Sequence, residues 1–166
     1  MDLYNPLEIE RIDKLSETND RLEDFFTNKR EQWNKELEPI FEVLQIANDL
    51  EDPKNPTKIL DAQAFSLTFK QKLNEENKLF MNKRSRESVK IKKIKYDKLI
   101  FYATGFGVKT NLTEKGLLID AHLAQNERTI EIIDSYLSFL MESIKNLESL
   151  GYAIKNMIEL LGYLRR

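Results

Sequence analysis

The sequence predicts an all-α protein made of long helices, and two patterns support this expectation. Apolar residues recur at every third or fourth position from Ile119 to Leu161, which is the spacing that keeps one side of a helix apolar. No glycine or proline interrupts residues 57–103, so a second long segment is free of helix breakers. We therefore expect long helices with heptad seams that pack as a helical bundle or coiled coil.

The apolar seam near the carboxyl end suggests self-assembly. As a helix, residues 119–161 would be about 65 Å long at 1.5 Å per residue, which exceeds what one compact monomer covers. A second apolar stripe, from Ile132 to Leu164, runs beside the first and indicates packing on two sides. We expect several copies to form a homo-oligomeric ring. The side chains expected to build the contact are Ile130, Ile133, Leu137, Leu140, Ile144, Leu147, Ile154 and Ile158.

Two residues interrupt the seam, and each has two interpretations. Asn126 is either a buried polar residue that sets the helix register or a residue at a solvated helix end. Gly151 marks either a close helix crossing or a break between two helices. The spacing alone does not choose between these alternatives.

Prolines and caps predict where the other helices begin and end. Pro6 after an asparagine favours a helix start, and a seam that ends at Leu44 follows it. Pro39 should kink or restart that helix, and Pro56 should open the next one. Thr113 is the expected cap of the last helix. This predicts an acidic N-terminal helical extension, residues 1–52, and a core domain, residues 57–166, with a basic helix, a glycine turn and a long C-terminal helix.

The composition argues against catalysis and against a membrane protein. The chain has no cysteine and a single histidine, His122, which rules out thiolate chemistry and leaves almost no imidazole chemistry. We see no nucleophile, metal-ligand spacing or tuned acid-base pair, so we expect neither an enzyme nor a cofactor. No apolar run approaches the roughly 20 residues that a bilayer span needs. We expect a cytoplasmic protein.

The formal net charge of -2 conceals a strong asymmetry along the chain. Residues 1–61 carry 16 acidic and 8 basic side chains, whereas residues 62–109 carry 4 acidic and 12 basic ones. General solubility does not explain a basic block within an acidic protein. Binding to a polyanion is the leading reason for such a concentration of charge.

The basic residues gather between positions 83 and 98, where we place a nucleic-acid site. The predicted phosphate contacts come from Arg84, Arg86, Lys90, Lys92, Lys93, Lys95 and Lys98. The aromatic residues Tyr96, Phe101, Tyr102 and Phe106 lie in the run or just beyond it, where bases could stack, and we expect Tyr102 and Phe106 to make these contacts. The alternative is a solvated lysine face that pairs with the acidic N-terminal helix of its own or a neighbouring subunit.

Near the carboxyl end, residues 151–158, with the sequence GYAIKNMI, resemble the closing helix of the UvsY-type recombination mediators of tailed phages. The aliphatic helix before it and the basic run ending in Phe101-Tyr102, followed by Gly105 and Gly107, are similar in kind to that family. The likeness covers residues 57–164. Lys98 falls on a basic position of the family pattern, whereas Tyr96 stands where a basic residue is expected.

The resemblance implies a ring-forming accessory protein that binds single-stranded DNA. Such mediators help a RecA-like recombinase to displace single-strand binding protein and to load onto DNA, and a phage-encoded mediator would act in the host cytoplasm. The alternative function is an oligomeric coiled-coil scaffold or chaperone whose basic segment binds an acidic protein partner.

Overall fold

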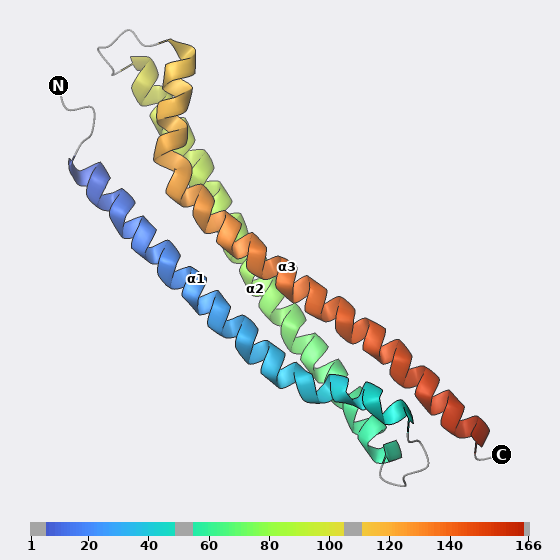
Figure 1. Ribbon diagram of the computed structural model, residues 1–166. Coiled ribbons are helices and arrows are strands. Elements are labelled where there is room, and N and C mark those ends of the chain that lie inside the picture. Colours follow the sequence, from blue (N-terminus) through green and yellow to red (C-terminus); the bar gives the residue numbers. More distant parts are fainter. Residues whose placement is uncertain (1–5, 49–54, 105–110, 165–166) are drawn as a thin grey trace. The chain divides into compact units, whose positions relative to one another are not determined.

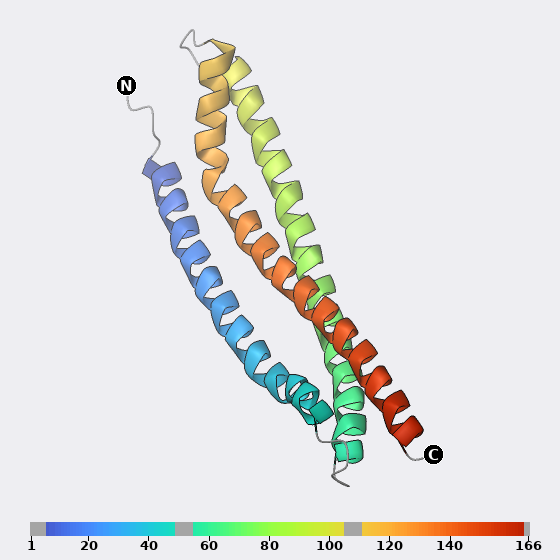
Figure 2. The same ribbon diagram turned by 45° about the vertical axis from the view of Figure 1, so that its right-hand side comes forward.

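The computed structural model describes residues 6–48, 55–104 and 111–164, and these residues are almost entirely helical (Figures 1 and 2). They form α1 (Pro6–Phe41), α2 (Asn55–Thr104) and α3 (Leu112–Leu164), with a short 3-10 helix, η1 (Glu42–Asn48), after α1. No strand occurs in these three ranges, which confirms the all-α expectation. None of the described helices combines the length and the apolar character that crossing a membrane requires.

The amino ends of the first two helices follow the prolines. α1 begins at Pro6, and α2 begins at Asn55 with Pro56 as its second residue. Proline suits the first turn of a helix because the amide hydrogen that it lacks would have no partner there. Both starts agree with the expected positions.

The start of α3 differs from the expectation by two residues. The Glu114 amide donates a hydrogen bond to Asn111 Oδ1 at 2.8 Å, and the Asn111 amide donates to Glu114 Oε2 at 3.1 Å. This reciprocal pair is a capping box, in which each side chain satisfies the backbone amide of the other residue. Asn111 is therefore the cap, and Thr113 lies inside the first turn.

Pro39 does not end α1, and the change of helix type comes three residues later. α1 continues through Pro39 to Phe41, and η1 begins at Glu42. A 3-10 helix has 3.0 residues per turn instead of 3.6, so the buried face shifts around the axis. Val43 is 3% exposed and Leu44 is 43% exposed, and the expectation that Leu44 continues the seam is therefore wrong.

The chain forms two compact units, and α1, α2 and α3 each contribute a segment to both. Unit 1 contains residues 1–26 and 80–136, and unit 2 contains residues 27–79 and 137–166. Each unit thus draws on both of the expected segments, 1–52 and 57–166.

One end of unit 1 is held by three aromatic rings, one from each helix. Phe26 of α1 stacks on Tyr136 of α3 with ring centroids 4.3 Å apart. Phe80 of α2 meets Phe26 edge-on at 4.9 Å and Tyr136 edge-on at 5.3 Å. Edge-on and offset contacts suit the charge distribution of aromatic rings, so the cluster joins the three helices.

Polar contacts show the direction of the helices within unit 1. Asn19 of α1 contacts Gln125, and Glu23, one turn later, contacts Arg128, so α1 and α3 run parallel. For α2 and α3 the contacts run in opposite order, because Arg84 meets Asp134 whereas Tyr102 meets His122. Within this unit α2 is therefore antiparallel to α3.

Unit 2 packs the other halves of the same helices. Trp33 of α1 meets Phe69 of α2 edge-on with centroids 6.1 Å apart. Lys70 Nζ lies 2.7 Å from Glu148 Oε1 and links α2 to α3 at the surface. Ile59, Leu73, Leu140 and Ile154 are fully buried.

The seam of α3 is covered by the chain's own helices over most of its length. The buried members of the predicted contact set are Ile133, Leu137, Leu140, Leu147 and Ile154, with Ile130 and Ile144 half-buried. The apolar seam therefore needs no second chain to cover it over this length, because α1 and α2 supply the partner surfaces. Ile158 is the exception, with 36% of its surface exposed.

Gly151 lies in uninterrupted helix. α3 continues through it, and a Cβ atom added at this position would meet no atom within 4 Å. It is therefore neither a helix break nor a close crossing within the chain.

Candidate nucleic-acid interface

The basic run between residues 83 and 98 lies on α2 within unit 1, and most of it faces solvent. The helix is continuous here because Val89 to Ile91, which alternate in a strand-like way, are flanked by long stretches of helix-forming residues. Every predicted phosphate contact is exposed except Lys98, which is partly buried. Within unit 1, α2 carries eight Lys and Arg against two acidic residues, whereas residues 6–26 of α1 carry seven acidic against three basic ones.

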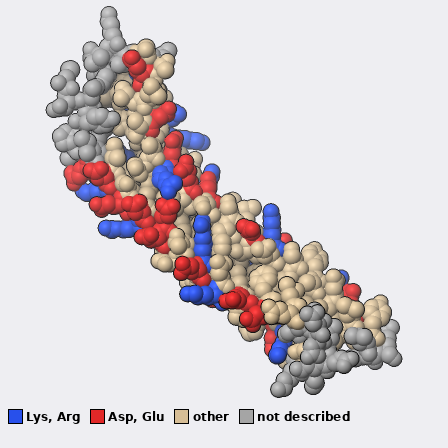
Figure 3. Space-filling view, viewed as in Figure 1, with Lys and Arg blue, Asp and Glu red and all other residues tan. Residues whose placement is uncertain are grey.

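Acidic side chains dominate the amino-terminal half of α1, as the face drawn in Figure 3 shows. The exposed members in unit 1 are Glu10, Asp13, Glu17, Asp20, Glu23 and Asp24. The same unit therefore carries a negative segment of α1 and a positive segment of α2. Acidic groups of the same unit are available to pair with some of the cations of α2.

Four of the eight cations of the run are already engaged by neighbouring side chains, and one of them is Lys98, whose Nζ lies 5.9 Å from the centre of the Phe101 ring. Arg84 makes a two-point contact with Asp134 of α3, and its Nη2 lies 2.9 Å from Oδ2. The hydrogen bond to Asp134 raises the pKa of Arg84 above its usual value, so this guanidinium stays charged and paired. Lys90 Nζ lies 2.6 Å from Glu87 Oε1, and Lys83 Nζ lies 4.6 Å from the centre of the Phe80 ring.

Four cations remain open, and we call Arg86, Lys92, Lys93 and Lys95 the open cations. Each is exposed, and none forms an ion pair with an acidic side chain among the described residues. The sequence left open the alternative that these cations pair with the acidic N-terminal helix of the same chain. For the four open cations no such pair is seen among the described residues. Their charge is available to an external anion.

Of the two expected stacking residues, the structure describes only Tyr102, and Tyr102 is buried. It is 6% exposed and packs with Ile119 and Leu123 of α3. Its Oη lies 3.0 Å from His122 Nε2. The Tyr102 ring therefore belongs to the core of unit 1 and would have to leave it to meet a base. Phe106 lies outside the described residues.

The exposed aromatic residue beside the open cations is Tyr96. It is 65% exposed, and it lies one helical turn after Lys92 and Lys93. The spacing of the apolar residues along α2 distinguishes the buried Tyr102 from the exposed Tyr96. Ile91, Ile94 and Tyr102 fall on one face of α2, and they pack together, whereas Tyr96 is off that face.

A row of side chains on α2 points away from the helices that pack against it, and we call it the outer strip. Its members are Val89, Lys92, Lys93, Tyr96, Leu99 and Ile100, all exposed. Their separations of three, four and seven residues place them along one side of the helix. The outer strip therefore combines two open cations with an aromatic ring and three aliphatic side chains.

The interior behind the basic helix is partly polar. Asn126 is buried, and it lines a small hollow together with Arg11, Lys98 and His122. Asn126 is therefore not at a solvated helix end, and a buried polar position is the interpretation that the structure favours. Polar residues in a helix interface restrict the registers in which the helices can pair.

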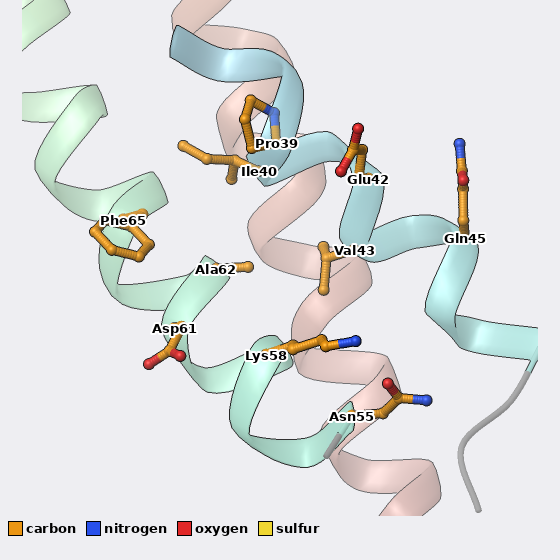
Figure 4. A pocket seen from close by; sticks show the side chains of 10 residues that line it. All are labelled: Pro39, Ile40, Glu42, Val43, Gln45, Asn55, Lys58, Asp61, Ala62 and Phe65. Carbon is orange, nitrogen blue, oxygen red and sulfur yellow. The ribbon is translucent and has the colours of Figure 1, made fainter. Parts of the chain in front are cut away.

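Unit 2 contains a larger hollow, of about 650 Å³, between the end of α1, η1 and the start of α2 (Figure 4). Val43 and Ala62 face each other across it, whereas Asp61 points away from the opposite helix. Its charged residues Glu42, Lys58 and Asp61 are exposed. Within the described ranges no three or more His, Cys, Asp or Glu residues are placed to hold a metal ion.

Comparisons with family models, with curated proteins and with solved structures found no match for this chain. The candidate interface therefore depends on the residues of this chain alone.

Proposed function

We propose that the protein binds single-stranded DNA through the open cations of α2 and acts as a recombination mediator. The observation that carries the proposal is the set of four exposed cations without acidic partners, next to an exposed aromatic ring on the same helix. Lysine and arginine neutralise backbone phosphates and release condensed counterions, which drives association with a strand. Aromatic rings beside such cations suit single strands because unpaired bases offer their faces.

The mediator role is supported by the resemblance at residues 151–158 and along the basic helix. In this role the protein would bind a single strand, act beside single-strand binding protein and assist a RecA-like recombinase. Self-assembly into a ring forms part of the proposal. Its support is that Leu160 and Tyr163, three residues apart on one side of α3, are exposed near the end of the helix, because neighbouring exposed apolar side chains often mark a contact surface.

Assembly would strengthen a weak site. Several linked copies on one strand raise the overall affinity by about 10² to 10⁴ without new contacts in each copy. Individual contacts then stay weak and reversible, which suits a protein that hands a strand from one binding protein to another.

The deciding experiment reverses three of the open cations, with Lys92→Glu, Lys93→Glu and Lys95→Glu in one variant. Affinity for a fluorescent oligo(dT) is measured by anisotropy at several salt concentrations. For the unchanged protein, the logarithm of affinity should fall linearly with the logarithm of salt concentration. The variant should bind more weakly, and the slope should fall by about 2, since each phosphate contact on a single strand contributes about 0.7.

A matched control reverses three exposed lysines of unit 2, with Lys35→Glu, Lys58→Glu and Lys145→Glu. This control has the same change in net charge, so it separates a local site from a general electrostatic effect. Equal losses in the two variants, or no binding by the unchanged protein in dilute buffer, would refute the site. An unchanged protein that ignores oligonucleotides but binds an acidic protein would favour the scaffold function instead.

The mediator step has its own assay. A RecA-like recombinase hydrolyses ATP on a single strand, and covering the strand with single-strand binding protein delays it. The protein should shorten that delay, and the variant with three reversed open cations should not. A protein that binds DNA but leaves the delay unchanged would refute mediation while leaving DNA binding intact.

A further inference from the structure

The outer strip contains more apolar surface than phosphate binding requires. Val89 is 64% exposed and Tyr96 is 65% exposed, although both lie within the run of lysines and arginines. Leu99 and Ile100 extend the same apolar surface by one more helical turn. Tyr96 makes no ring contact or hydrogen bond with any residue that the structure describes. Contiguous exposed apolar groups on a helix usually mark a surface that another molecule covers.

The charges on the outer strip discriminate between the kinds of molecule that could cover its apolar side chains. Two copies meeting through this face in a symmetric dimer would bring Lys92 and Lys93 of one copy close to those of the other. These like charges repel, and the neighbouring open cation Lys95 would add to the repulsion, whereas the exposed Asp97 supplies only one opposing charge. An anionic partner is favoured by the same charges.

Among nucleic acids, a duplex and a single strand would meet this surface differently. A duplex presents phosphates and keeps its bases stacked inside, so Tyr96 and the aliphatic residues around it would stay without a partner. A single strand offers both phosphates and unstacked base faces. Its phosphates would reach Lys92 and Lys93, one turn before Tyr96, while a base lies on the ring.

We propose that Tyr96 is the base-contacting residue of the outer strip and that it makes the interface selective for unpaired strands. This inference rests on the proposed DNA binding and adds the residue that distinguishes single strands from duplexes. Leu99 and Ile100, three and four residues after Tyr96, lie on the same side of the helix, where they would exclude water from one edge of the base. Lys92 and Lys93 bind the phosphate backbone of both single strands and duplexes. Affinity for any DNA therefore resides in the lysines, whereas selectivity for single strands resides in Tyr96.

The first test compares Tyr96→Ala with Tyr96→Phe for binding to oligo(dT) and to a duplex of equal length. Loss of one stacked base should weaken single-strand binding by about 5- to 150-fold, whereas duplex affinity should change by less than about twofold. Tyr96→Phe keeps the aromatic face and should bind within about twofold of the unchanged protein. Because Tyr96 is exposed, neither change should disturb the helix, and circular dichroism checks this.

Phe65→Ala is the matched control. Phe65 is 56% exposed on α2 within unit 2, so the change removes an aromatic side chain of comparable exposure outside the outer strip. The control should leave both affinities unchanged. An equal single-strand loss in Phe65→Ala and Tyr96→Ala would overturn the assignment of the base contact to Tyr96.

A spectroscopic test reads the contact directly. In Tyr96→Trp, the introduced indole should emit as an exposed group, while the natural Trp33 is buried in unit 2 and serves as an internal reference. Addition of oligo(dT) should quench the exposed emission and leave that of Trp33 unchanged. Binding without quenching would overturn the inference.

The outcomes separate this inference from the proposed function. If the unchanged protein binds no oligonucleotide, both fail. If it binds with the expected salt dependence but Tyr96→Ala keeps its single-strand preference, only the base contact fails. If Tyr96→Ala lowers the molecular mass in solution and leaves DNA affinity unchanged, the strip is a contact between copies and the inference is overturned.

Discussion

Asn19 and Thr129 join α1 to α3 inside unit 1 through a direct side-chain hydrogen bond. Thr129 Oγ1 donates to Asn19 Oδ1 at 2.7 Å, and Asn19 Nδ2 donates to the main-chain oxygen of Gln125 at 2.8 Å. Asn19 is buried, so both of its polar atoms are satisfied where water is excluded. A shift of α1 by one turn would leave these groups unpaired, which makes this contact a determinant of helix register.

Asn19→Ala should therefore lower the free energy of unfolding by about 0.5–1.5 kcal/mol, because it removes the hydrogen bonds of a buried side chain to Gln125 and Thr129 of α3. Asn28→Ala is the control, since Asn28 is exposed on the same helix. The control should change stability by less than about 0.5 kcal/mol. Urea denaturation followed by circular dichroism measures both, and equal effects would show that the buried contact has no special weight.

The aromatic cluster of unit 1 should be a major source of stability. Phe26 is almost fully buried between Phe80 and Tyr136, so Phe26→Ala should cost about 3–5 kcal/mol of unfolding free energy. The adjacent Phe25 is 44% exposed, and Phe25→Ala should cost much less. Calorimetry on the two variants checks the ratio, and a comparable fall in melting temperature for both would contradict the packing described for Phe26.

The capping box at the start of α3 allows a direct comparison of two candidate caps. Asn111→Ala should cost about 1 kcal/mol, since it removes the acceptor of the Glu114 amide. Thr113→Ala should be neutral or slightly stabilising, because Thr113 is an exposed residue of the first turn and alanine favours helix. Thermal denaturation measures the stability of both variants. A larger loss of stability in Thr113→Ala than in Asn111→Ala would show that Thr113 is the cap.

Gly151→Ala should stabilise the protein by about 0.5–1 kcal/mol. The glycine lies in an α-helix without a positive φ angle, and an added Cβ would meet no atom within 4 Å. Alanine therefore reduces the freedom of the unfolded chain without strain in the folded one. Chemical denaturation measures the gain. If the variant instead assembles less well by light scattering, Gly151 lies at a close contact between copies.

The exposed and buried positions of α2 show which features of the candidate site can be predicted from the sequence and which cannot. The concentration of basic residues between 83 and 98 was evident from the sequence, and the structure places most of them in solvent. Tyr102 is expected to stack because it follows the basic run, yet it lies against α3 beside His122, whereas Tyr96 is exposed. Proximity to a charged run does not tell which way a side chain faces, whereas the identity of the packed neighbours does.

The sequence by itself determined the helical class, the start of α1 at Pro6, the start of α2 next to Pro56, and the segregation of charge among the helices. These features are local, since spacing, proline chemistry and formal charge act within a few residues. Only the tertiary structure decided that the α3 seam is covered by the chain's own helices, and that the Tyr96 side chain is exposed while the Tyr102 side chain is buried. Periodicity shows that a helix face is apolar, but the surface that covers it is supplied by segments far away in the chain.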